Sequence, residues 1–253
     1  MLFSIQKANM WKRFAAWMLD AILVLILATG AGSGFSALLG YDAQYQVVND
    51  GYARYEAQYG VSLDISYEEY GALSEAERKN WDAAANALRT DEAVLEAYSN
   101  VIGLTLLITA LSVLVAVVIC EFVVPLFLHN GQTVGKKIFG LCLIRNDGVK
   151  VNNLQLLTRA LLCKGTLETL VPAFALLTVS WGISGVFGIA VLVGVLLAPV
   201  VCVFASKNNA ALHDLMAGTI VVDAASQRIF GSTEDLVEYQ KKVAAERAAQ
   251  QKY

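Results

Sequence analysis

Four apolar stretches alternate with polar segments along the chain. The first opens WKRFAAWMLDAILVLILATG at Trp11 and continues to Leu39. A helix needs about 20 consecutive apolar residues to cross the core of a bilayer, so this pattern predicts four transmembrane helices. The four helices are expected over residues 11–39, 101–128, 161–179 and 186–204.

The polar segment between the first two apolar stretches has a different character. Residues 41–98 are rich in acidic residues and tyrosines, and they contain two capping boxes, Ser66-x-x-Glu69 and Ser74-x-x-Glu77. We expect a solvated helical insert outside the bilayer. An acidic cap that attracts cations is the alternative that the composition leaves open.

The polar loop after the second apolar stretch predicts a small sheet. KIFGLCLIR is typical of a short strand, Asn146-Asp147-Gly148 of a turn, and VKV of the returning strand of a β-hairpin. Asn152 or Asn153 then caps a helix. The distant segment TIVV also has the character of a strand, and it could pair with KIFGLCLI.

The expected fold is therefore an all-α membrane protein. It is a four-helix transmembrane bundle with an extramembrane helical insert and a small cytoplasmic β-hairpin. Its expected segments are 1–40 (N-terminus and first span), 41–98 (acidic insert), 99–128 (second span), 129–160 (hairpin loop), 161–205 (third and fourth spans), 206–231 (the segment with LHDLMAGT) and 232–253 (polar helical tail).

Composition agrees with this interpretation and excludes several classes. The chain is 57% hydrophobic and 16% charged, whereas a soluble domain is about half apolar and a quarter charged. The net charge of −3 without basic patches excludes a nucleic-acid partner. Four cysteines without CxxC spacing and two histidines predict no disulfide framework, no metal site and no cofactor. The first apolar stretch is too long for a signal-peptide core, so we expect it to be retained.

The distribution of lysine and arginine predicts the orientation. These residues gather before residue 14, between residues 129 and 164, and after residue 206, and the turn near residue 182 has none. Positive charge favours the cytoplasmic side. Both termini and the hairpin loop are therefore expected in the cytoplasm, and the acidic insert outside.

Charged residues inside the apolar stretches are the candidate functional groups. Arg13 and Asp20 lie on one face of the first predicted helix. A charge in a membrane helix costs a few kcal/mol, so it is retained for a partner or for a function. On this topology Glu121 and Glu168 fall at a depth similar to that of Asp20. The cations expected around the same layer are Arg13, Arg159, Lys164 and Lys207.

Both glutamates also precede a proline by four residues, Pro125 and Pro172. Proline has no N–H and cannot bond the carbonyl four residues back in an α-helix. Each glutamate would then place a carboxylate beside a free backbone carbonyl, a ligand pair that suits a hard cation. Coincidence is the alternative, because prolines are common in membrane helices.

Three segments, RFAAWMLDAILV, GQTVGKKIFGLCLI and LHDLMAGTIVV, together resemble the RDD family of bacterial membrane proteins. The resemblance covers everything except the 41–98 insert and the tail, and it implies a multi-pass protein of the bacterial cell membrane. It implies that Arg13, Asp20 and Asp214 are the arginine and the two aspartates that name the family. It assigns the loop motif to Gly131, Gln132, Thr133, Gly135 and Lys136. Cys142 departs from the family, which usually has an arginine there.

The resemblance implies transport, because some family members are linked to cation–proton antiport. We expect a cation/proton antiporter or other small-solute transporter, with Asp20, Glu121 and Glu168 as the ion or proton site. The alternative is a non-catalytic membrane scaffold or accessory subunit. Asp20 and Asp214 could imitate an aspartic dyad, but no substrate pocket can be named and no enzyme is expected. The expected partners are the lipid bilayer, monovalent cations, protons and, through the glycines of the last span, a second copy of the chain.

Overall fold

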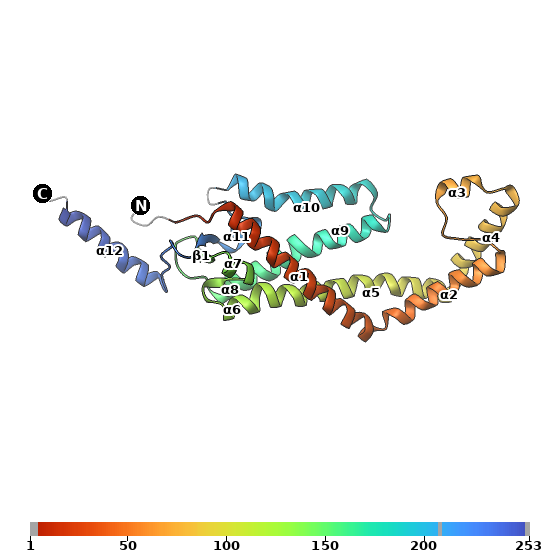
Figure 1. Cartoon of the computed structure of the whole chain (residues 1–253), viewed down its shortest axis with the longest axis horizontal. Coiled ribbons are helices and arrows are strands. Elements are labelled where there is room, and N and C mark those ends of the chain that lie inside the picture. The colour runs from red at the N-terminus through yellow and green to blue at the C-terminus, as the bar shows by residue number, and fades with distance from the viewer. Residues whose placement is uncertain (1–4, 207–208, 251–253) are drawn as a thin grey trace. The chain divides into compact units, whose positions relative to one another are not determined.

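The four predicted spans are present (Figure 1). The structure is a computed structural model that describes residues 5–206 and 209–250, apart from the side chain of His129. Within these residues, four helices are long and apolar enough to cross a membrane. They are α1 (Met10–Leu39); α5 (Glu92–Val117) continued by η1 (Val118–Val123) and α6 (Val124–Phe127); α8 (Asn153–Leu157) continued by η3 (Thr158–Leu170) and α9 (Val171–Ser180); and α10 (Gly185–Ala205). The predicted fold class is confirmed.

Polar caps explain where the second and third spans begin. Asp91 accepts hydrogen bonds from the backbone N–H groups of Ala93 and Val94, so α5 starts before its apolar part. Asn152 and Gln155 form a capping box at the start of α8, which runs without interruption into the third span. The third helix is therefore longer than the apolar stretch that predicted it.

Two π-helical segments, η1 and η3, interrupt the second and third spans, and the sequence analysis did not predict them. In each one, the residue before the proline donates to the carbonyl five residues back, Val124 to Ile119 and Val171 to Thr166. In that register the missing proline N–H does not face the carbonyl four residues back. The Glu-x-x-x-Pro spacing therefore does not by itself free the glutamate carbonyls.

A two-stranded antiparallel sheet confirms the pairing of the two distant segments. Strand β1 (Leu141–Arg145) pairs with β2 (Thr219–Asp223), in a register that places Leu143 opposite Val221. The sheet has a buried core on both faces: Leu141 and Leu143 pack on one, and Cys142 and Ile144 on the other. Short helices accompany it at one end of the spanning helices, namely α6, α7 (Val134–Ile138), α8 and α11 (Leu212–Ala217) (Figure 1).

The predicted hairpin return is much reduced, which corrects the expected partner of β1. The turn at Asn146–Gly148 forms, but VKV contributes only a single bridge, between Ile144 and Lys150. The N–H of Lys150 instead donates to the carbonyl of Phe230. Since β2 occupies the other edge of β1, the sheet is closed by a segment distant in the sequence.

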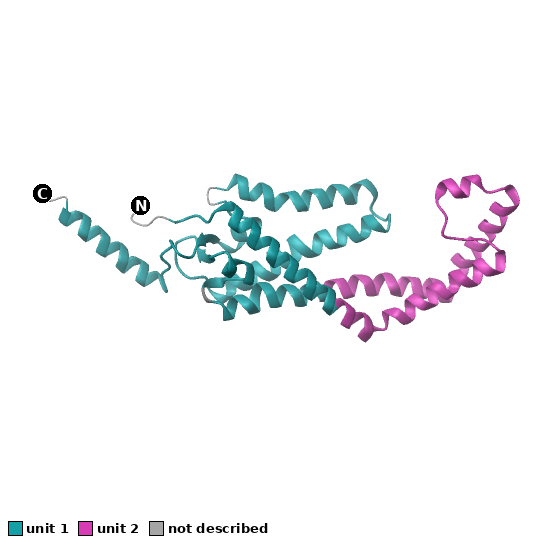
Figure 2. Cartoon of the chain, viewed as in Figure 1, with its two compact units in different colours: residues 1–31, 112–253 teal, residues 32–111 magenta. Residues whose placement is uncertain are grey.

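The insert belongs to a second compact unit, residues 32–111 (Figure 2). Its helices are α2 (Tyr41–Tyr59), α3 (Tyr67–Ala72) and α4 (Glu75–Thr90). Both predicted capping boxes are present. Asp91 accepts a hydrogen bond from Tyr55 at 2.9 Å and pairs with Arg54, so this acidic unit has its own internal polar contacts.

The predicted tail helix is α12 (Thr233–Gln250). Leu236 and Phe230 form a small apolar cluster with Val149, and Tyr239 packs against it. The start of the tail therefore packs against the loop that follows β1.

Candidate functional site: a buried ionic network

The loop motif folds back onto the first span and binds Asp20. Thr133 is the N-cap of α7, and its hydroxyl donates a hydrogen bond to Asp20 Oδ2 at 2.5 Å. The backbone N–H of Gly135 donates to Asp20 Oδ1 at 2.8 Å. Hydrogen bonds to an ionised carboxylate are among the stronger ones, so this buried acid is held by two donors from one short loop.

Glycine is required at position 135 by close packing. A Cβ there would lie 2.3 Å from the carbonyl oxygen of Ala16 and 2.9 Å from the carboxyl carbon of Asp20. The turn that precedes this position uses left-handed backbone at Asn130 and Gly131. Gln132 fixes the turn from the other side, by donating to the carbonyl of Leu141 at 2.7 Å.

Lys136 is buried in the same loop. Its Nζ donates to Thr133 Oγ1 at 3.2 Å and lies 4.0 Å from Asp20 Oδ2. Burial lowers the pKa of Lys136 to about 8, and the charges of Arg159 and Lys164 also act to lower it. The unfolded chain therefore binds more protons than the folded one between pH 8 and 10.5, so this lysine makes the stability increase with pH across that window.

Asp214 joins the first and third spans. It is fully buried in α11, with Arg13 Nη2 at 3.4 Å from Oδ2 and Arg159 Nε at 3.0 Å from Oδ1. Thr219 also donates to Oδ1 at 3.2 Å. Burial would raise the pKa of Asp214, but the charges of His213, Arg159 and Arg13 outweigh burial and hold it well below the usual value.

Glu121 lies in η1 and joins the second and third spans. Its Oε1 pairs with Lys164, and its Oε2 lies 3.6 Å from Arg159 Nη1. Although Glu121 is almost completely buried, Oε2 has no hydrogen-bond partner. A buried acceptor without a partner is uncommon and indicates room for a bound water or ion.

Glu168 pairs with His213, a residue that the sequence analysis did not select. The Nδ1 of His213 lies 2.8 Å from Oε2 of Glu168, and the backbone N–H of His213 donates to Oε1 at 3.2 Å. Burial lowers the pKa of His213, so the imidazole is neutral at pH 7. Its Nδ1 then carries the hydrogen that it donates to the carboxylate.

Together these groups form one network, which we call the ionic network. Lys136 and Arg159 connect its parts, because the pKa of Lys136 responds to Asp20, Glu121, Arg159 and Lys164. Its members are four acids and four bases: Asp20, Glu121, Glu168, Asp214, Arg13, Lys136, Arg159 and Lys164. The formal charges balance, as expected for charges buried at membrane depth.

The structure brings the predicted site residues into this network but divides their partners differently. In the part of the chain that is described, Arg13 and Asp20 share no ion pair: Arg13 binds Asp214 and the carbonyl of Asn209. Asp20 binds Thr133 and Gly135 instead. Lys207, expected in the same layer, lies outside the described residues. His213 was signalled only by its place beside Asp214 in LHDLMAGT.

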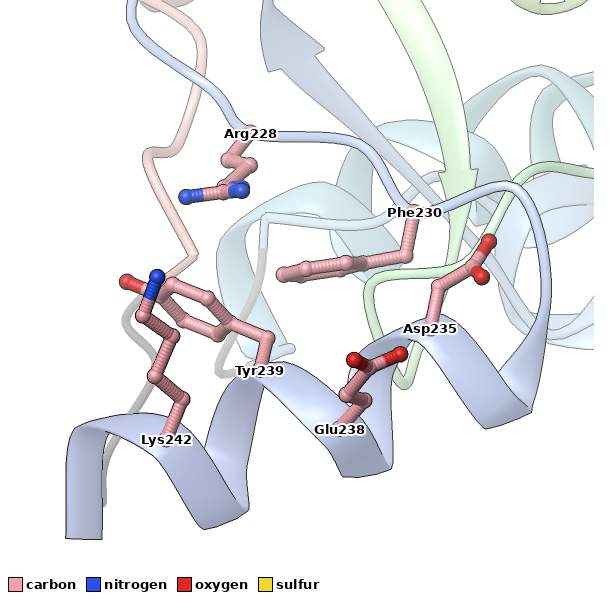
Figure 3. A pocket seen from close by; sticks show the side chains of 6 residues that line it. All are labelled: Arg228, Phe230, Asp235, Glu238, Tyr239 and Lys242. Atoms are coloured by element: carbon pink, nitrogen blue, oxygen red, sulfur yellow. The ribbon is translucent and has the colours of Figure 1, made fainter. Parts of the chain in front are cut away.

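A metal centre finds no support in this arrangement. Across residues 5–206 and 209–250, no group of three or more histidine, cysteine, aspartate or glutamate side chains could hold a metal ion. A cavity of about 230 Å³ lies away from the ionic network, where Arg228 covers the ring of Tyr239 (Figure 3). Its lining residues are Arg228, Phe230, Asp235, Glu238, Tyr239 and Lys242.

Comparison with known proteins gives one match. The profile of the RDD family matches residues 7–218, which is more than half of the chain and includes every member of the ionic network. Among curated proteins and solved structures, no match was found.

Proposed function

The chain belongs to the RDD family of membrane proteins, and from this premise we propose that it exchanges protons for monovalent cations across the bilayer. One observation carries the proposal: the charges at the ends of the spans form a buried and balanced ionic network, in place of scattered surface pairs. Ionisable groups inside membrane helices are costly and commonly mark ion or proton pathways. Asp20 is the central carboxylate of the proposal, because it is buried and lies beside a lysine that titrates near neutral pH.

Proton-driven cation flux in vesicles tests this proposal. Purified protein in sealed vesicles is expected to release protons when sodium, potassium or lithium is added on the opposite side. Asp20→Asn should abolish the pH-dependent flux, because a neutral amide cannot bind the cation in exchange for a proton. Glu121→Gln and Glu168→Gln are expected to weaken the apparent cation affinity with less effect on the maximal rate.

The matched control is Asp147→Asn, since Asp147 is an exposed aspartate paired with Arg145 at the tip of the turn. This variant should transport like the wild type. Normal flux in Asp20→Asn vesicles would show that Asp20 is only a structural partner of the loop.

The proposed orientation places both termini and residues 129–160 in the cytoplasm and the insert outside, in a bacterial cell membrane. The asymmetry of lysine and arginine supports it. Single cysteines at exposed positions of the insert, such as Tyr67, are expected to react with an impermeant reagent from the outside of intact cells. Labelling of the insert only after the membrane is permeabilised would reverse the orientation.

A second candidate function is a non-catalytic scaffold or accessory subunit. The observation in its favour is that each carboxylate of the ionic network already has a hydrogen-bond or ionic partner within the chain. Such a network could serve only to lock four helices together. Absence of flux with all three cations at every pH gradient would favour this function. Assembly of several copies belongs to the antiport proposal, because four spans are few for a transporter.

A further inference from the structure

We infer that a single monovalent cation binds at Asp20 and Thr133 in place of the ammonium group of Lys136, once that lysine has released its proton. The inference rests on the proposed function and names the site where the exchange takes place. The exchange is balanced: Lys136 loses one proton and becomes a neutral amine, and one cation enters. The net charge of the buried network is therefore the same in both states.

The geometry places three polar atoms around one point. Thr133 Oγ1 lies 2.5 Å from Asp20 Oδ2 and 3.2 Å from Lys136 Nζ, and Nζ lies 4.0 Å from Oδ2. The ammonium group thus occupies the position of a counterion, held by one neutral hydroxyl and by a carboxylate that it does not reach with a hydrogen bond. Carboxylate and hydroxyl oxygens are the ligands that hard cations prefer.

A second carboxylate faces the same lysine. The Oε2 of Glu121 is buried and has no hydrogen-bond partner, although its charge acts on Lys136. Buried orphan acceptors are normally satisfied by water or by an ion. A cation at Asp20, with its remaining water, would satisfy this atom as the lysine does not.

The groups that face Lys136 favour release of its proton near neutral pH. Asp20 from α1 and Glu121 from η1 stabilise the ammonium form, whereas Arg159 and Lys164 from η3 oppose it. With burial added, the pKa of Lys136 falls to about 8. The neutral form that admits a cation is therefore populated at a mildly alkaline cytoplasmic pH.

Charge balance selects a monovalent ligand. Replacing one ammonium charge by one alkali cation leaves the network neutral, but a divalent cation would leave an additional buried positive charge. Uncompensated charge in such an environment costs several kcal/mol. The exchange is also expected to be one proton for one cation, and so to be independent of the membrane potential.

Thermal unfolding of the full chain in detergent tests the site without measuring transport. Sodium chloride is compared with choline chloride at equal ionic strength between pH 6.5 and 9.5. Sodium should raise the unfolding midpoint at pH 9.5 and have little effect at pH 6.5. Competition with one proton makes the apparent Kd about tenfold weaker for each pH unit below about 8.

Two substitutions of the lysine predict opposite results. Lys136→Arg keeps a permanent charge and should lose the sodium response at every pH. Lys136→Gln leaves the site open, so sodium should stabilise it equally at pH 6.5 and 9.5. If the larger arginine prevents folding, Lys136→Gln alone decides. The control is Lys137→Gln, which changes an exposed neighbour and should respond like the wild type.

The outcomes separate this site from the antiport proposal. A sodium response of the wild type that is equal at both pH values, or absent at all of them, overturns the site even if vesicles show flux. The predicted pH-dependent binding without flux would support the site and refute antiport.

Discussion

Replacing Asp214 by alanine is expected to lower the free energy of unfolding by about 3–5 kcal/mol, because it leaves Arg13 and Arg159 buried without their shared counterion. The hydrogen bond from Thr219 is lost as well. Thermal or denaturant unfolding in detergent measures the change. The pKa of Asp214 lies below its unfolded value of 3.8, so its stabilising contribution is complete above pH 3.8 and is lost as the pH falls further.

A double-mutant cycle identifies the partner. Arg13→Ala and Asp214→Ala should be less than additive, with a coupling of about 0.5–3 kcal/mol, as found for residues in one network. Arg13→Ala and Asp20→Ala should add within error, since these two residues bind different partners. Additive effects in the first cycle together with coupling in the second would contradict the arrangement described.

The second large effect is expected at Gly135. In Gly135→Ala, the new methyl group would meet the backbone of Ala16 and the carboxylate of Asp20, neither of which can move away easily. Overpacking costs about 1–3 kcal/mol, and weakening the hydrogen bond to the charged Asp20 adds about 1.5–3 kcal/mol. We expect the free energy of unfolding to fall by about 2–5 kcal/mol, with a parallel loss of flux.

Gly194→Ala in α10 is the control for this substitution. An added Cβ there meets no heavy atom within 4 Å, and alanine is the better helix former. The unfolding midpoint of this variant should stay the same or rise. Equal stability of the two alanine variants would show that the loop does not pack closely on the first span.

The sequence predicted the spans and the strands for a clear physical reason. A membrane helix must be apolar over its whole length, so a linear pattern is enough to locate it. The pairing of β1 with β2 was also foreseen, because both segments are short and rich in β-branched or apolar residues. The reduced hairpin return was not, since the bond from Lys150 to Phe230 is made with a distant segment.

The partners of the charges could not be predicted in this way. The shared helix face of Arg13 and Asp20 suggested that they are coupled, and nothing in their spacing indicates that a loop inserts Thr133 and Gly135 beside Asp20. The π-helical turns have no reliable signature, yet η3 contains Arg159, Lys164 and Glu168. A wider helical turn changes which side chains meet, so the positions of these charges follow from tertiary structure.

The place of Asp214 in the chain bears on how the protein is made. This carboxylate follows Arg13 by 201 residues, and ribosomes add about 5–20 residues per second. The first span therefore waits roughly 10–40 s in or near the membrane before its counterion is synthesised. Arg13 must meanwhile stay with lipid phosphates or water at the interface, and the strand pairing that positions α11 is among the last steps of biosynthesis. Insertion of the helices and closure of the ionic network are thus separate events in time, and a ribosome that stalls before residue 214 leaves a bundle of spans with unpaired arginines.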